Sequence, residues 1–231
     1  MSDDARQRAV YNKRLPCSVK LCPKKRTFTA QFCCTHQLRR RLHGHHLGRH
    51  IQKKEYTPYL KTVRAFLTKH QHHAAVKAAL EIMASLLAPP KEEPQGKPLR
   101  LNPSWQLWRE LWRLKQEGVT PQEALEVVLA VWLYSYHFPH QLRDDKRLDY
   151  ALAASVFRLR ELASRKQWVQ NNLRPSGFVQ TTSRRPGALP NALLGGRIRT
   201  ALVPFWINFI KALEAEHAAR AKKAADLKAA F

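Results

Sequence analysis

Every cysteine of the chain lies between residues 17 and 34, in the stretch CSVKLCPKKRTFTAQFCCTHQLRRRLHG, and this clustering constrains the fold of that region. The stretch is basic and offers few apolar residues to bury thiols. Four residues separate Cys17 from Cys22, ten separate Cys22 from Cys33, and two separate Cys33 from His36. Three thiolates and an imidazole suit tetrahedral zinc, with one pair on a turn and the other on the first turn of a helix. We therefore predict a zinc site at Cys17, Cys22, Cys33 and His36.

Two alternatives to this ligand set are open. Cys34 duplicates Cys33 and could supply the third thiolate, but the two-residue gap between Cys33 and His36 is the commoner helical geometry. The other alternative is a set of free cysteines without metal. The N-terminus has no apolar stretch like that of a signal peptide, and no run of the chain reaches the length of a membrane span. We expect a cytoplasmic protein, in which reduced thiols favour metal over disulfides.

The charge of the chain is large and unevenly distributed. It has 41 Lys and Arg against 17 Asp and Glu, for a net charge of +24. Between Asp4 and Glu55 there are fourteen basic and no acidic residues, and between Glu161 and Glu214 there are eight basic and no acidic residues. Residues 81–161, in contrast, carry eleven basic and eleven acidic residues. Two such tracts are typical of a polyanion-binding surface. Nucleic acid is the first expected partner, and an anionic membrane face is the second.

The zinc site is expected to support a short helix that ends at Gly44. Leu38 and Leu42 lie four residues apart and can pack inward, while three consecutive arginines fan over the exposed side. These arginines are candidates for contacts with guanine edges, and the other cations for contacts with phosphates. The candidate nucleic-acid contacts in this first tract are Lys20, Lys24, Lys25, Arg26, Arg39, Arg40, Arg41, His43, Arg49, Lys53 and Lys54. In the second tract they are Arg174, Arg184, Arg185, Arg197 and Arg199.

The same stretch resembles the small zinc finger found near the N-terminus of many phage and mobile-element proteins, including some HNH homing endonucleases. That pattern reads approximately C-S-V-x-G-C, followed by G-L-C-x-x-H-Y-x-R-x-x-R-H-G. The residues that match it are Cys17, Ser18, Val19, Cys22, Cys33, His36, Arg39, His43 and Gly44. Leu21 stands where glycine is usual, Gln37 stands where an aromatic is usual, and the middle is longer. The resemblance covers residues 17–44 and implies a nucleic-acid-binding module.

The association with endonucleases makes catalysis an alternative, because HGHHLGRH places four histidines directly after the finger. A histidine-metal nuclease centre could use them to activate water. An HNH site also needs an acidic residue beside its first histidine, and an asparagine and a final histidine across a hairpin and helix. The chain has no carboxylate near these histidines and no convincing hairpin. We therefore expect the histidines to extend the binding surface, and we expect no enzymatic activity.

The rest of the chain is predicted to be helical, so the fold class is mainly α, a small zinc finger followed by a multi-helix body. Apolar periodicity and capping signals predict helices over residues 58–70, 74–88, 103–117, 121–138 and 145–169. A loop is predicted over 171–190, followed by one or two helices interrupted near Pro204. No strand is expected. The predicted parts are a basic zinc-finger module at 1–54, a helical hairpin at 55–88, a linker at 89–98 and a helical domain at 99–231.

Three tryptophans share one face of the helix predicted over residues 103–117. Trp105, Trp108 and Trp112 recur at spacings of three and four. Beside Leu107 and Leu111, such a stripe is typical of a core, although exposed indoles could stack on bases. We expect the core role.

Together these features predict a non-enzymatic, zinc-dependent protein that binds nucleic acid, with DNA favoured over RNA. We expect it to belong to a phage or other mobile element and to act in the cytoplasm, associated with the nucleoid. The alternative is an adaptor that docks onto a larger nuclease, transposase or polymerase complex. An adaptor would copurify with a protein partner in a defined ratio, whereas a binder would shift DNA by itself.

Overall fold

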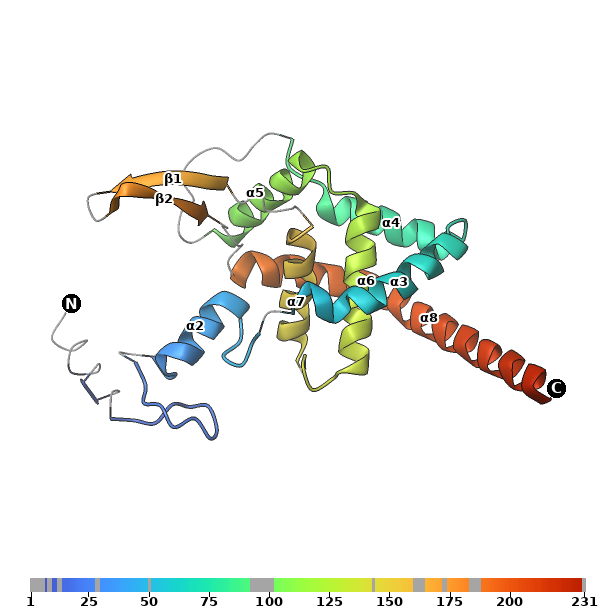
Figure 1. The fold of residues 1–231 in the computed structure, drawn as a ribbon, viewed down its shortest axis with the longest axis horizontal. Coiled ribbons are helices and arrows are strands. Elements are labelled where there is room, and N and C mark those ends of the chain that lie inside the picture. Colours follow the sequence, from blue (N-terminus) through green and yellow to red (C-terminus); the bar gives the residue numbers. More distant parts are fainter. Residues whose placement is uncertain are drawn as a thin grey trace.

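The computed structural model describes residues 7, 10–11, 14–27, 30–49, 51–91, 102–142, 144–159, 165–171, 174–182 and 188–229. Helices dominate this part of the chain, which confirms the mainly α fold class. A small metal-finger segment with helix α2 (Cys34–His43) lies at one end of the helical body, and the C-terminal helix α8 (Ala188–Ala229) projects from the other (Figure 1).

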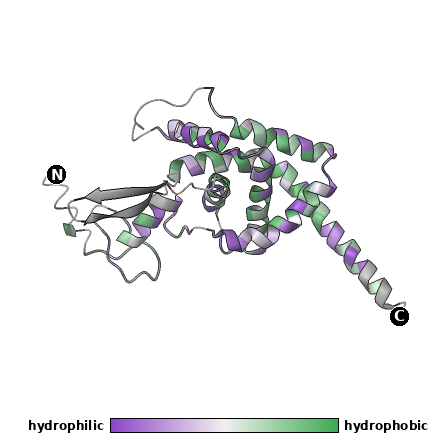
Figure 2. Cartoon of the chain, turned by 45° about the horizontal axis from the view of Figure 1, so that its top comes forward, coloured by the Kyte–Doolittle hydropathy of each residue, from purple (hydrophilic) through white to green (hydrophobic). Residues whose placement is uncertain are grey.

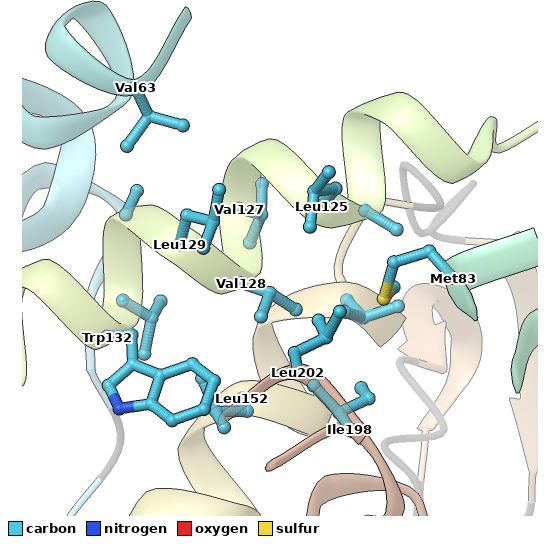
Figure 3. Close-up of a cluster of buried hydrophobic side chains, with 14 of the residues drawn as sticks. Val63, Met83, Leu125, Val127, Val128, Leu129, Trp132, Leu152, Ile198 and Leu202 are labelled. Atoms are coloured by element: carbon cyan, nitrogen blue, oxygen red, sulfur yellow. The ribbon is translucent and has the colours of Figure 1, made fainter. Parts of the chain in front are cut away.

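The body is built around α6 (Pro121–His137), in which every side chain from Ala124 to Tyr134 is buried. Helices α3 (Lys53–Lys69), α4 (Ala74–Leu87) and α7 (Asp145–Phe157) pack against it, and α8 packs along α7, α4 and α5 (Pro103–Gln116). Figure 3 shows side chains from these helices meeting around α6, among them Val63, Met83 and Leu202. The predicted segments 55–88 and 99–231 therefore contribute to one continuous core.

Local capping signals explain where several helices begin. The Asn102 side chain accepts a hydrogen bond from the Trp105 N–H at the start of α5. Thr120 and Glu123 form a reciprocal capping box before α6, and Asp144 caps α7. These three starts were predicted from the sequence and are confirmed.

Helix α3 begins earlier than predicted. Gln52 and Glu55 form its capping box, so the helix starts at Lys53 and Pro58 lies inside it. Proline lacks the N–H that would bond to the carbonyl one turn earlier. The Thr57 hydroxyl donates to the Lys53 carbonyl at 2.7 Å in the same turn. The predicted start at Pro58 was wrong because the more N-terminal capping box dominates.

The prediction of a helix up to residue 169, followed by a loop, was also wrong. Helix α7 ends at Phe157, and an antiparallel hairpin follows, with β1 (Arg165–Asn171) paired to β2 (Arg174–Thr182). Trp168 and Val169 lie opposite Val179 and Phe178 in the register, and aromatic and β-branched residues of this kind favour strands. Helix α8 runs without a break through Pro204.

The core face of α5 is formed by leucines, which corrects the expectation that the tryptophan stripe is core. Leu107, Leu111 and Leu114 are buried, whereas Trp105 and Trp112 are partly exposed and Trp108 is 48% exposed. Figure 2 shows hydrophilic residues along the projecting part of α8 and around the finger. Among the described residues, no helix combines the length and apolarity needed to cross a bilayer.

Candidate metal centre and basic surface

The first two cysteines lie on a tight knuckle formed by residues 15–26. Pro16 and Lys25 form an isolated antiparallel bridge, and the Cys17 N–H donates to the Lys24 carbonyl at 2.9 Å. The Cys22 N–H closes a turn on the Val19 carbonyl at 3.1 Å. These backbone bonds bring the two thiols to the same side of the loop, since they fix the turn between them.

The second pair lies at the start of α2. Cys33 is the N-cap residue and His36 is in the first turn. The His36 Nδ1 atom is 3.4 Å from the Cys17 sulfur and 3.3 Å from the Cys33 sulfur, and the Cys22 and Cys33 sulfurs are 4.0 Å apart. All four candidate ligand atoms lie within 4.8 Å of one another. The chain thus folds into a Cys3His cluster suited to one metal ion.

Cys34 does not take part in this cluster. Its side chain is exposed, and its sulfur lies 3.9 Å from the Thr35 hydroxyl. Cys33 is only 1% exposed and lies against Phe32 and Cys17 in a small apolar cluster. Folding therefore places Cys33, rather than its neighbour, among the ligands.

The electrostatics of the cluster favour a thiolate at Cys17. Burial acts to raise the pKa of this thiol. Hydrogen bonds from the backbone N–H groups of Cys33 and Val19, together with the neighbouring side chains of His36 and Cys22, outweigh burial and lower the pKa to about 6. The thiolate is the form that ligates a metal.

Basic side chains surround this centre. Lys20, Lys25, Arg39 and Arg40 are exposed, and Arg40 lies over the Phe32 ring at 5.7 Å.

Two further cations of the knuckle are exposed or partly exposed and also hold the finger together. Lys24 donates to the Thr35 hydroxyl, and Arg26 donates to the Pro16 carbonyl and the Ser18 hydroxyl.

The prediction that Leu38 packs inward was wrong, because this side chain is 52% exposed. For Arg41 and Leu42 the structure describes only the backbone.

The histidines after the finger connect it to the body. The Arg147 guanidinium donates to His45 Nδ1 at 3.1 Å, and His45 Nε2 lies 3.9 Å from an Asp144 carboxylate oxygen. His46 stacks on Phe32 with ring centroids 4.7 Å apart. Burial first, and then the charge of Arg147, lower the pKa of both His45 and His46. We call His43, His45 and His46, together with Phe32 and the residues around the start of α7 that they contact, the histidine joint.

His43 completes this joint through an edge-on contact with Tyr150 of α7, at 5.5 Å between ring centroids. The sequence alone showed no carboxylate near these histidines, whereas folding brings one from a residue about a hundred positions away. Sequence reasoning missed this joint because the histidines and their partners on α7 are far apart in the chain and no local sequence pattern links them.

Arg49 is exposed, but contacts with other residues of the protein engage its guanidinium. It makes a bidentate ion pair with Glu55 at 2.7 and 3.0 Å, and it donates to Gln141 and to the Tyr134 hydroxyl at 2.9 Å each. Lys53 and Lys54, in the first turn of α3, are exposed. Of these three candidate phosphate contacts, only the two lysines present free surface charge.

The second basic tract is only partly described. Arg199 pairs with Asp149 at 2.6 Å and with Asp145 at 3.1 Å, which holds α8 against α7. Arg197 is exposed on α8. For Arg174 the structure describes the backbone alone, and Arg184 and Arg185 lie outside the described residues.

Comparison of the chain with family models, with curated proteins and with solved structures finds no match. The candidate function therefore depends on the chemistry of the residues themselves.

Proposed function

We propose that this protein binds one zinc ion and uses the resulting finger to bind DNA without catalysing a reaction. One observation carries the proposal: the Cys3His cluster holds α2 against a cationic knuckle in a stretch without a single carboxylate. The cations exposed there are Lys20, Lys24, Lys25, Arg39 and Arg40.

Zinc is the ion that this ligand set suits best. A tetrahedral zinc with Zn–S bonds of about 2.3 Å and Zn–N bonds of about 2.0 Å places ligand atoms about 3.5 to 3.8 Å apart. The three separations between ligand atoms given above, from 3.3 to 4.0 Å, bracket that range. Three thiolates also exclude the hard cations Mg²⁺ and Ca²⁺ as preferred occupants.

The arrangement of α2 favours duplex DNA over duplex RNA. Arg39 and Arg40 lie on consecutive positions of a ten-residue helix, and both are exposed. An isolated helix of this kind fits the major groove of B-form DNA, where guanidinium groups can reach guanine edges. The major groove of A-form RNA is too narrow and deep for such contacts. The likeness to the fingers of phage and mobile-element proteins points the same way and suggests a role at the nucleoid.

Absence of catalysis is part of the proposal. His45 accepts a hydrogen bond from Arg147, and His46 stacks on Phe32, so both imidazoles have structural contacts. Plasmid DNA incubated with the protein and Mg²⁺, Mn²⁺ or Zn²⁺ should stay intact. Cleavage that His45→Ala abolishes would contradict this part of the proposal.

The DNA-binding role is tested by titrating labelled duplex with zinc-loaded protein at several salt concentrations. Arg39→Ala and Arg40→Ala should each weaken binding by about 1 to 3 kcal/mol, because each removes a candidate base contact. Lys77→Ala, which removes an exposed cation from α4, is the matched control and should bind as the wild type does. Wild-type affinity in both arginine variants would refute the proposal.

A second candidate function is an adaptor in a larger nucleoprotein complex. It is favoured by two exposed apolar side chains on the finger, Leu21 and Leu38. Replacing both with serine should leave DNA affinity unchanged under either function, because neither leucine is a candidate DNA contact. Loss of a stoichiometric partner from the purified native complex, with DNA affinity retained, would favour the adaptor.

A further inference from the structure

Helix α5 presents tryptophans to solvent although its core face is complete without them. Leu107, Leu111 and Leu114 bury that face, and Trp108 remains 48% exposed on the outer side. Trp105 and Trp112 lie one turn before and after it, three and four residues away, and are partly exposed. Half-exposed indole surface is unfavourable in water, and aromatic residues of this kind mark binding surfaces.

Cations lie over the two flanking indoles. The Arg109 guanidinium is 5.0 Å from the ring centroid of Trp105, and the Lys115 ammonium is 5.6 Å from that of Trp112. Trp108 lies between them along the helix. Among the described residues, no cation lies over the Trp108 ring, and about half of this residue is exposed to solvent.

The charge of this face favours an anionic partner. The one carboxylate of α5, Glu110, is buried and forms ion pairs with Arg113 at 3.0 Å and Arg109 at 4.0 Å. It therefore neutralises part of the positive charge beneath the surface and presents no negative charge to solvent. Lys115 is exposed next to Trp112. The outer face of α5 thus combines open aromatic surface with positive charge.

We infer that the outer face of α5 is a second binding site, for single-stranded nucleic acid. A base stacks on Trp108, and Arg109 and Lys115 take the neighbouring phosphates. Aromatic rings interleaved with cations are the recurring chemistry of single-strand binding, because every base has a π-face and every nucleotide a phosphate. A duplex does not fit this site, since its base faces are covered by their neighbours. The site is separate from the finger and does not depend on zinc.

The test uses the full-length protein and a fluorescently labelled oligo(dT) strand, with binding followed by anisotropy. Trp108→Ala should raise Kd about 5- to 150-fold, the range that corresponds to the loss of one stacked base. Trp108→Phe should keep most of the affinity because it retains an aromatic ring. Tyr136→Ala removes a similarly exposed aromatic side chain from α6 and is the matched control, with no change expected.

A second variant tests the charges independently of packing at Trp108. Arg109→Gln with Lys115→Gln should weaken oligo(dT) binding and reduce the slope of log K against log salt by about 0.7 for each phosphate that is left without its cation. Trp108→Ala should leave the affinity of the finger for duplex DNA unchanged, so failure of the finger proposal and failure of this one are distinguishable. The inference is wrong if wild-type protein does not bind oligo(dT). It is also wrong if the Trp108→Ala and double-glutamine variants both bind as tightly as wild type, or if Tyr136→Ala weakens binding as much as Trp108→Ala.

Discussion

Replacing Cys33 with alanine should remove the metal, whereas the same change at the adjacent Cys34 should not. Structural zinc contributes an apparent free energy of about 10 to 16 kcal/mol in small fingers at neutral pH. An equal share for each of four ligands gives about 2.5 to 4 kcal/mol for one thiolate, or a fall in affinity of about 60- to 800-fold. Cys33 is also 1% exposed, so its removal disturbs the packing around Phe32.

Cys34 offers the matched control because it lies one residue away, is exposed and has no part in the cluster. Its replacement should change stability by no more than about 0.5 kcal/mol, as is usual for surface positions.

The assay is competition for zinc against a chromophoric chelator, with total metal measured after desalting. Wild type and Cys34→Ala should each retain one equivalent, and Cys33→Ala should lose it to the chelator. Circular dichroism should show that the helical body is folded in both variants, because its core contains no finger cysteine. Loss of zinc from Cys34→Ala with retention in Cys33→Ala would refute the ligand assignment.

Three further predictions concern the fold around the finger and body. Leu21 is fully exposed and has a left-handed backbone conformation, with φ at +61°. Leu21→Gly should stabilise the finger by about 0.5 to 1 kcal/mol, because the relief of left-handed strain exceeds the added entropy of the unfolded chain. The gain would be measured as tighter zinc retention, and unchanged or weaker retention would contradict this prediction. A hydrogen bond from Lys69 lowers the pKa of Glu216 to about 2, so this carboxylate stabilises the fold above about pH 4.5 and loses its effect as pH falls towards 2. Glu216→Gln should therefore cost about 1 kcal/mol in urea unfolding at pH 7 after screening, and the difference from wild type should shrink below pH 4.5; a constant difference would argue against the ion pair. A Cβ at Gly195 would lie 1.8 Å from a backbone oxygen of α7, whereas a Cβ at Gly196 would meet only a carboxylate oxygen at 3.6 Å. Gly195→Ala should therefore lower the midpoint of thermal unfolding by many degrees, and Gly196→Ala should lower it by few. Equal midpoints in the two variants would refute the close approach of α7 and α8.

The parts of the fold that could be predicted from the sequence are those fixed by local signals. Asn102, Thr120 and Asp144 start their helices as expected because a cap acts within one turn. The β-hairpin was missed because strand pairing joins residues as far apart as Arg165 and Thr182, and the preceding helical pattern masked it. The asparagines at 171 and 172 were the available turn signal.

The candidate site divides in the same way. The ligand set was predictable because its four residues lie within twenty positions and metal geometry dictates their spacing. The partners of Arg49 and His45 on the body, about a hundred residues away, were not predictable. The predicted core role of the tryptophans was wrong for a different reason. Periodicity places the three indoles on one face of the helix, but it does not show whether that face or the leucine face packs against the core.

The first turn of α7 connects the finger to the body. Asp144 caps the helix, forms an ion pair with Arg147 at 3.0 Å and approaches His45, while Arg147 itself donates to His45. Within the next turn, Asp149 pairs with Arg199 of α8. Because these contacts lie within the first two turns of α7, the finger is held by the same element that packs α8 into the core. Under the proposed function, a DNA contact made by α2 would therefore require less ordering of the finger on binding, which is how preorganisation increases affinity. Polar contacts between partly exposed groups also weaken with salt, so under the proposed function we expect the salt dependence of DNA binding to contain a contribution from the histidine joint as well as from phosphates.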